Sequence, residues 1–188
     1  FSQAAQAFGA AARERERSNL ATLVTSNPTM ADGLAVFHAT HGNLAESGGA
    51  LSVATLGAAR LAMRKQKGVD GVTPIEMAPT SLLVPAALET AAEQVLASIA
   101  AATVDDANPF SQKLELVVDA RLDTSSATAW YLVARAAEGL EYSYLEGQQG
   151  VQIFTREGFD VDGLEIKARL DFGAGWIDWR SWYKNAGA

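Results

Sequence analysis

The segment LEIKARLDF, residues 164–172, alternates strictly between apolar and charged side chains. Successive side chains of a strand point to opposite faces of a sheet, so the segment predicts a strand with one apolar and one charged face. The turn signal Asp162-Gly163 precedes it and predicts a hairpin with VQIFTRE, residues 151–157. This stretch therefore places antiparallel strands in the second half of the chain.

Other segments nearby have the β-branched and aromatic content of strands, and turn-forming sequence separates them. They are KLELVVD (113–119), ATAWYLVA (127–134) and LEYSYLE (140–146). The tail WIDWRSWYKN (176–185) contains three of the four tryptophans of the chain.

The first half of the chain has helical composition. Residues 3–26 are rich in Ala, Arg, Glu and Leu and predict one long helix, which Asn27-Pro28 should end because the residue before a proline is disfavoured in the α region. The apolar stripe of this helix is narrow, which predicts that it lies across a surface. With SLLV (81–84) as a short buried strand, the expected fold class is α+β.

Two shorter helices are predicted between these regions. Ser52 is a good N-cap for a helix that should run to about Lys67, with Gly68 as the residue that follows its end. Another helix should begin at Pro85, because proline is favoured in the first turn.

The composition excludes several classes of protein. The chain has 188 residues, 48% of them hydrophobic and 20% charged, which is typical of one globular domain or of one domain with an inserted lobe. It contains no cysteine, so disulfides and thiolate metal sites are excluded. The formal charge is −7, and the basic cluster RERER (13–17) alternates with glutamate, so neither a sequence-specific nor a general nucleic-acid interface is expected. A membrane span needs about 20 apolar residues, and the sequence has no such stretch.

The two histidines are the strongest candidates for a metal site. His38 and His41 lie three positions apart in FHATHGNLA (37–45), and Asp32 or Glu46 would have to complete the ligand set. A catalytic zinc typically keeps three protein ligands, and the glycine in this stretch indicates a turn. We therefore expect both imidazoles to form hydrogen bonds with the loop backbone, and we expect no metal, cofactor or catalytic residue.

Other motifs give no catalytic assignment. The sequence has no GxSxG, no GxxxxGK[ST] and no GxGxxG. The tryptophans Trp176, Trp179 and Trp182 have the chemistry to stack on bases or sugars, or to anchor a protein interface. The profile as a whole indicates an interaction or structural protein.

Several long blocks resemble one family. They are FHATHGNLA (37–45), LSVATLGAARLAMRKQKGVDG (51–71), PTSLLVPAALETAAEQVL (79–96), NPFSQKLELVVDARLD (108–123), YLEGQQG (144–150) and GFDVDGLEIKARLDFGAGWIDWRSWYKN (158–185). In this order they resemble the C-terminal half of the major capsid proteins of Mu-like phages and prophages, including those fused to a prohead protease.

The resemblance implies the Hong Kong 97-type capsid fold. Residues 1–43 and 141–188 would form the peripheral lobe, with a long spine helix and antiparallel strands, and residues 44–140 would form the inserted axial lobe. The family's N-terminal arm and extended loop are expected to precede this chain and to be absent from it.

The function that the resemblance implies is structural and not enzymatic. Copies of the chain would assemble into an icosahedral shell, with a scaffold or prohead protease as partner during assembly. The subunit would belong to the virion capsid and would assemble in the bacterial cytoplasm, without a membrane.

Three alternatives remain open. One is an encapsulin-type nanocompartment shell, one is a metal-dependent hydrolase that uses His38 and His41, and one is a tail or adaptor component of a phage.

Overall fold

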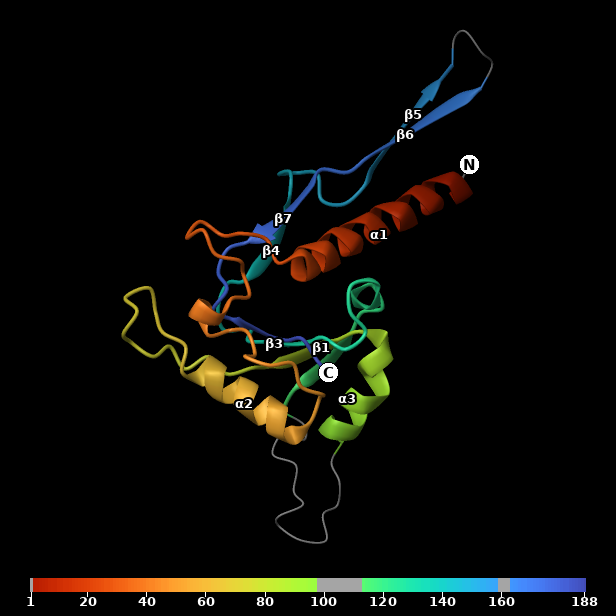
Figure 1. Ribbon diagram of the computed structural model, residues 1–188. Helices are drawn as coiled ribbons and strands as arrows, with labels where there is room; N and C mark the ends of the chain where they lie inside the picture. Colours follow the sequence, from red (N-terminus) through yellow and green to blue (C-terminus); the bar gives the residue numbers. More distant parts are fainter. Residues whose placement is uncertain (1, 98–112, 159–162) are drawn as a thin grey trace. The chain divides into compact units, whose positions relative to one another are not determined.

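The computed structural model describes residues 2–97, 113–158 and 163–188 (Figure 1). The chain divides into two compact units, and each is built from two segments. The first, called the helix-hairpin unit, comprises Phe1–Val24 and Leu140–Gly175, and the second, called the sheet unit, comprises Thr25–Gly139 and Trp176–Ala188. Residues 25–43 and 176–188, which the sequence analysis assigned to the lobe of the long helix, fall in the sheet unit.

The long helix predicted from the sequence is present as α1, Ser2–Ser26. It ends where predicted, because Asn27 adopts a positive φ of 49° directly before Pro28. Half of its described side chains are exposed, and Ala21 and Val24 are its buried apolar residues. This agrees with the narrow apolar stripe seen in the sequence.

The strands of the helix-hairpin unit form two pairs. They are β4 (Leu140–Tyr144) with β7 (Phe172–Trp176), and β5 (Gln152–Glu157) with β6 (Leu164–Arg169). The β5–β6 pair is antiparallel, as predicted, although residues 159–162, and with them part of the predicted Asp162-Gly163 turn, lie outside the described residues. Its register places Ile153 opposite Ala168 and Thr155 opposite Ile166, so the alternation in the sequence makes one face of this hairpin mainly apolar.

The sheet unit is built on four strands in the order β2-β1-β3-β8. Their bounds are Ser81–Val84 for β1, Glu115–Val118 for β2, Trp130–Val133 for β3 and Trp182–Asn185 for β8. β3 is antiparallel to both of its neighbours, but β1 and β2 are parallel, which corrects the expectation of a purely antiparallel second half. Parallel neighbours require a crossover, and the 3-10 turn η2 (Ala86–Leu88) and helix α3 (Glu89–Leu96) lie between them in the chain.

Helix α2 spans Val53–Arg64 and begins as predicted. Ser52 caps it in a capping box with Thr55, which satisfies backbone groups that a helix start would otherwise leave unpaired. The helix ends before the predicted Lys67, because that residue already forms a β-bridge with Pro74. Gly68 therefore belongs to the loop that follows and is not the helix cap.

The core of the sheet unit lies between the sheet and its helices. Figure 1 shows α2 and α3 on the same side of β1 and β3. The core side chains are fully or almost fully buried and are contributed by α2 (Leu56, Ala59 and Met63), β1 (Leu82 and Val84), β3 (Trp130 and Leu132) and α3 (Ala92). Each large apolar side chain buried in this way contributes about 1.5–3 kcal/mol, so this layer is a major source of stability for the unit.

The aromatic tail belongs to this sheet. Tyr183 and Asn185 of β8 are buried, and the Trp182 ring meets the Trp176 ring edge-on at 5.1 Å. Among the residues that the structure describes, no helix combines the length and the apolar character needed to cross a membrane.

Candidate functional site

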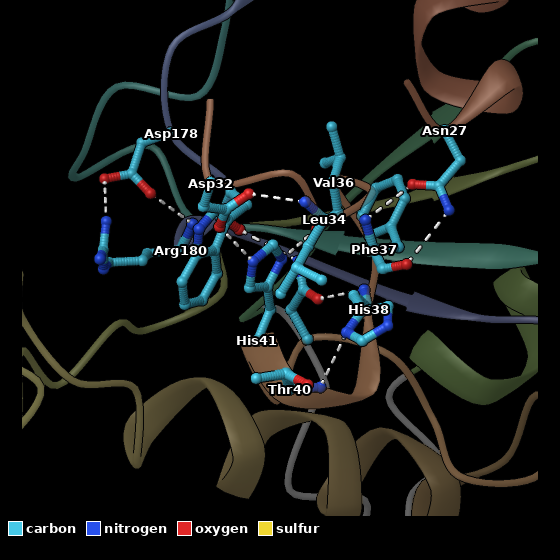
Figure 2. A network of polar contacts seen from close by, with 12 residues as sticks. Asn27, Asp32, Leu34, Val36, Phe37, His38, Thr40, His41, Asp178 and Arg180 are labelled. Atoms are coloured by element: carbon cyan, nitrogen blue, oxygen red, sulfur yellow. Dashed lines mark hydrogen bonds and ion pairs between the residues drawn. The ribbon is translucent and has the colours of Figure 1, made fainter. Parts of the chain in front are cut away.

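The segment between α1 and α2 contains both histidines and is held by side-chain amides. Asn27 Oδ1 accepts a hydrogen bond from the Phe37 amide at 2.7 Å, and Asn27 Nδ2 donates to the Phe37 carbonyl at 3.1 Å (Figure 2). The Phe37 ring is buried 5.6 Å from the ring of Tyr131 and 5.7 Å from that of Trp176. These contacts hold the start of the segment that contains both histidines against the sheet. We call this segment, residues 37–45, the histidine loop.

His41 is buried, and both of its ring nitrogens are engaged. Nδ1 lies 3.0 Å from the Val36 carbonyl oxygen, and Nε2 lies 2.8 Å from Asp32 Oδ2 (Figure 2). Both partners are hydrogen-bond acceptors, so both contacts are satisfied together only when each nitrogen carries a proton. Both ring nitrogens therefore face oxygen atoms of the same unit.

Asp32 is the partially exposed member of this pair. Its carboxylate accepts hydrogen bonds from the Leu34 amide at 3.0 Å and from His41. These two contacts, with the backbone one contributing more, hold the pKa of Asp32 below its ordinary value. The carboxylate therefore favours its ionised form in the folded chain.

An aromatic stack extends from His41. The rings of His41 and Trp179 are parallel within 5°, with centroids 4.1 Å apart, and the Arg180 guanidinium lies 4.5 Å from the Trp179 ring centroid on its face. Asp178 pairs with Arg180 at 2.8 Å, and Arg180 Nε donates to the Lys67 carbonyl at 3.0 Å. The stack thus joins the histidine loop, the tail and the loop after α2 within one unit.

Asn43 is the fully buried polar residue of this region. Its Nδ2 donates to the carbonyls of Val36 at 2.8 Å and of Trp179 at 3.4 Å, and its Oδ1 accepts from the His38 amide at 3.1 Å. A buried amide with every contact satisfied fixes local geometry, because removing it leaves backbone groups unpaired.

His38 has a local role. Its Nδ1 accepts a hydrogen bond from the Thr40 amide at 3.1 Å and so caps the 3-10 turn η1, Ala39–His41. The prediction that both imidazoles bond to the loop backbone is confirmed. The described residues hold no group of three or more His, Cys, Asp or Glu side chains placed to bind a metal.

The three tail tryptophans do not form one exposed platform. Trp179 stacks on His41, and Trp176 and Trp182 contact each other, so their faces meet partners within the sheet unit. This arrangement was not predicted from the sequence. The partners Asn43 and Trp179 are 136 residues apart, and no local pattern indicates such a contact.

The described surface of the sheet unit includes a recess and a loop tip with exposed apolar side chains. The recess has a volume of about 490 Å³ and lies against α2, where Ala58 and Ala62 form part of its wall. The tip is the loop after α2, whose Val69 and Val72 are 92% and 75% exposed. This tip was not predicted from the sequence, although the Asp70-Gly71 dipeptide between two valines is a turn signal that could have indicated it.

Comparison with known proteins gives one match. The sequence profile of a family described as phage capsid protein matches residues 1–185. No curated protein and no solved structure matches the chain. A match over nearly the whole sequence, together with a mixed helix and sheet architecture compatible with a capsid fold, shows that the chain belongs to the phage capsid protein family.

Proposed function

We propose that the chain is the major head subunit of a Mu-like tailed phage or prophage, and that its copies build a closed icosahedral shell. The observation that carries the proposal is the family match over residues 1–185. A capsid family is structural and not enzymatic, and it implies assembly with other capsid subunits in the virion. Assembly in the bacterial cytoplasm, and a scaffold or prohead protease as partner, are parts of the same proposal.

The Hong Kong 97-type fold is proposed for the subunit. Two segments distant in sequence, Phe1–Val24 and Leu140–Gly175, share one compact unit, which is the topology expected when a lobe is inserted between them. The helix-hairpin unit, with α1 as spine helix, would then be the peripheral lobe, and the sheet unit would be the axial lobe. This assignment moves residues 25–43 and 176–188 to the axial side of the boundaries predicted from the sequence.

The histidine geometry weighs against the hydrolase alternative. His41 contacts an acceptor with each ring nitrogen, and His38 uses Nδ1 to cap its own turn. A histidine ligand needs a nitrogen lone pair directed at the metal, whereas both ring nitrogens of His41 face a backbone or carboxylate oxygen. We therefore propose that the histidine loop is a connecting segment that stabilises the sheet unit.

Light scattering coupled to size exclusion, applied to the expressed full-length gene product, tests the proposal. Particles of megadalton mass are expected, and zinc and other transition metals should stay far below one equivalent per chain. A species that remains monomeric or dimeric at every concentration would contradict the proposal. Stoichiometric metal with hydrolytic activity would favour the hydrolase.

A further inference from the structure

The recess beside α2 is bordered mainly by small side chains. Its volume is about 490 Å³, and we call it the alanine recess because Ala39, Ala45, Ala58 and Ala62 contribute to its wall. Ligand pockets usually have volumes between about 300 and 1,000 Å³ and combine an apolar wall with a few polar groups. The alanine recess therefore has the size and the wall of a binding site.

Two buried polar side chains of β8 reach into this recess. Tyr183 and Asn185 both line it and are 7% and 5% exposed. Asn185 Oδ1 accepts hydrogen bonds from the amides of Gly49 and Gly187, each at 2.9 Å, which fixes the orientation of the side-chain amide. In the part of the chain that the structure describes, Asn185 Nδ2 and the Tyr183 hydroxyl have no hydrogen-bond partner, yet neither atom is sealed in the interior. Both groups are therefore open to the recess.

Gly49 leaves the Asn185 donor accessible. A Cβ added at Gly49 would lie 3.9 Å from Asn185 Nδ2 and 3.1 Å from Thr55 Cγ2. All three residues line the recess, so a side chain at position 49 would occupy part of it. The missing side chain thus keeps space in front of the amide.

Glu46 supplies the charge of the site. Among the described residues that line the recess, it is the only charged one. Burial first, and the Glu46 carboxylate second, raise the pKa of Tyr183 above its ordinary value of 10.0. The hydroxyl therefore stays protonated and is able to donate one hydrogen bond and to accept others. The recess thus presents a carboxylate acceptor, an amide donor and a hydroxyl that serves in both roles.

This set of groups selects the chemistry of a ligand. Glu46 favours a charged donor, and Asn185 Nδ2 requires an acceptor oxygen. A carboxylate ligand would meet Glu46 with like charge, and a simple amine would leave Asn185 Nδ2 without a partner. An ammonium group next to a carbonyl group satisfies both requirements, and small side chains fit beside the alanines.

We propose that the alanine recess binds the amino terminus of a peptide chain whose first residues are small. The ammonium group donates to Glu46 and to the Tyr183 hydroxyl, and the first carbonyl oxygen accepts from Asn185 Nδ2. The volume of the recess exceeds what these groups alone fill, which favours a peptide end over a single amino-acid amide. Binding of this kind needs only the sheet unit and does not depend on the proposed function.

Saturation-transfer NMR tests the inference, because it observes the methyl groups of a weakly bound peptide whatever the size of the protein. The probe is trialanine amide, and the wild-type chain should bind it with a Kd of about 1 mM or lower. Two control probes are N-acetyl-trialanine amide, which lacks the ammonium charge, and propylamine, which lacks the carbonyl. Each should bind about fivefold more weakly or worse, because one of the polar groups of the recess then loses its partner. Alaninamide should also bind more weakly, and equal affinities for alaninamide and the tripeptide would contradict the choice of a peptide.

Two variants place the binding in the recess. Ala58→Leu fills the recess from an exposed position of α2 and should weaken binding about tenfold, as a lost anchor contact does. Ala54→Leu is the matched control, since Ala54 is exposed on the same helix and does not line the recess. Glu46→Gln should weaken trialanine amide about fivefold and leave the acetylated probe unchanged. All three positions are exposed, so the thermal unfolding of the variants should match that of the wild type.

Three results would overturn the inference. They are no saturable binding of trialanine amide up to about 10 mM, equal affinity for the acetylated probe, and unchanged binding by both Ala58→Leu and Glu46→Gln. Each of these results would leave the proposed function standing, because particle formation is measured separately.

Discussion

His41 is held by contacts with both nitrogens and with the face of its ring. Each ring nitrogen of His41 faces an oxygen acceptor, and its ring lies flat on Trp179. The spacing and the glycine predicted the backbone contacts correctly, because these are local. The Trp179 partner was beyond the reach of sequence reasoning, since a residue in the distant tail supplies it.

Replacing Asp32 by Asn should destabilise the chain in a manner that depends on pH. The folded chain lowers the pKa of Asp32 from its ordinary value of 3.8, so its stabilisation is complete above that value and is lost as the pH falls through the lower folded pKa. The thermal midpoint of Asp32→Asn should therefore lie furthest below that of the wild type above pH 3.8 and approach it as the pH falls progressively below that value. Glu93→Gln, an exposed change on α3, is the control, and a difference independent of pH would contradict this account of Asp32.

Replacing the buried Asn43 by Ala should cost about 2–3 kcal/mol, because the His38 amide and the Val36 carbonyl lose a partner away from water. His38→Ala removes the cap of η1 and an edge-on contact with the His41 ring, and should cost about 1 kcal/mol. Urea unfolding of both variants measures the difference. Equal losses would show that the Asn43 network does not brace the loop.

At the scale of elements, sequence reasoning succeeded where the signal is short-range. The cap at Ser52, the break at Asn27 and the alternation in β6 all act within a few residues, and each of these elements is present. It failed for the parallel pairing of β1 with β2 and for the placement of β8 beside β3. Those pairings depend on contacts across long stretches of chain, which local periodicity does not encode.

The β5–β6 hairpin should be the least protected sheet element in the unassembled chain. Its side chains are mostly exposed on both faces, with Ile153, Phe154 and Leu164 at 36%, 51% and 38%, and an isolated two-stranded hairpin is marginally stable in water. Hydrogen exchange of its amides should be fast in free subunits and much slower in assembled particles. Protection equal to that of β1 and β3 in the free subunit would contradict this expectation.

At the scale of the whole molecule, these features fit a subunit of an assembly. Two compact units built from interleaved segments, with a largely exposed hairpin in one and two exposed valines on a loop of the other, suit a subunit whose stability is completed by its neighbours. Because the chain belongs to the phage capsid protein family, these neighbours are other capsid subunits. The arrangement of the two units in a shell is part of the proposal.

Cryo-electron microscopy of the particles formed by the full-length gene product tests the central claim most directly. The account predicts a closed icosahedral shell in which each copy contributes the helix-hairpin unit and the sheet unit to the wall, with α1 lying along its surface. A product that forms no particles, or particles whose subunits do not contain these two units, would contradict it.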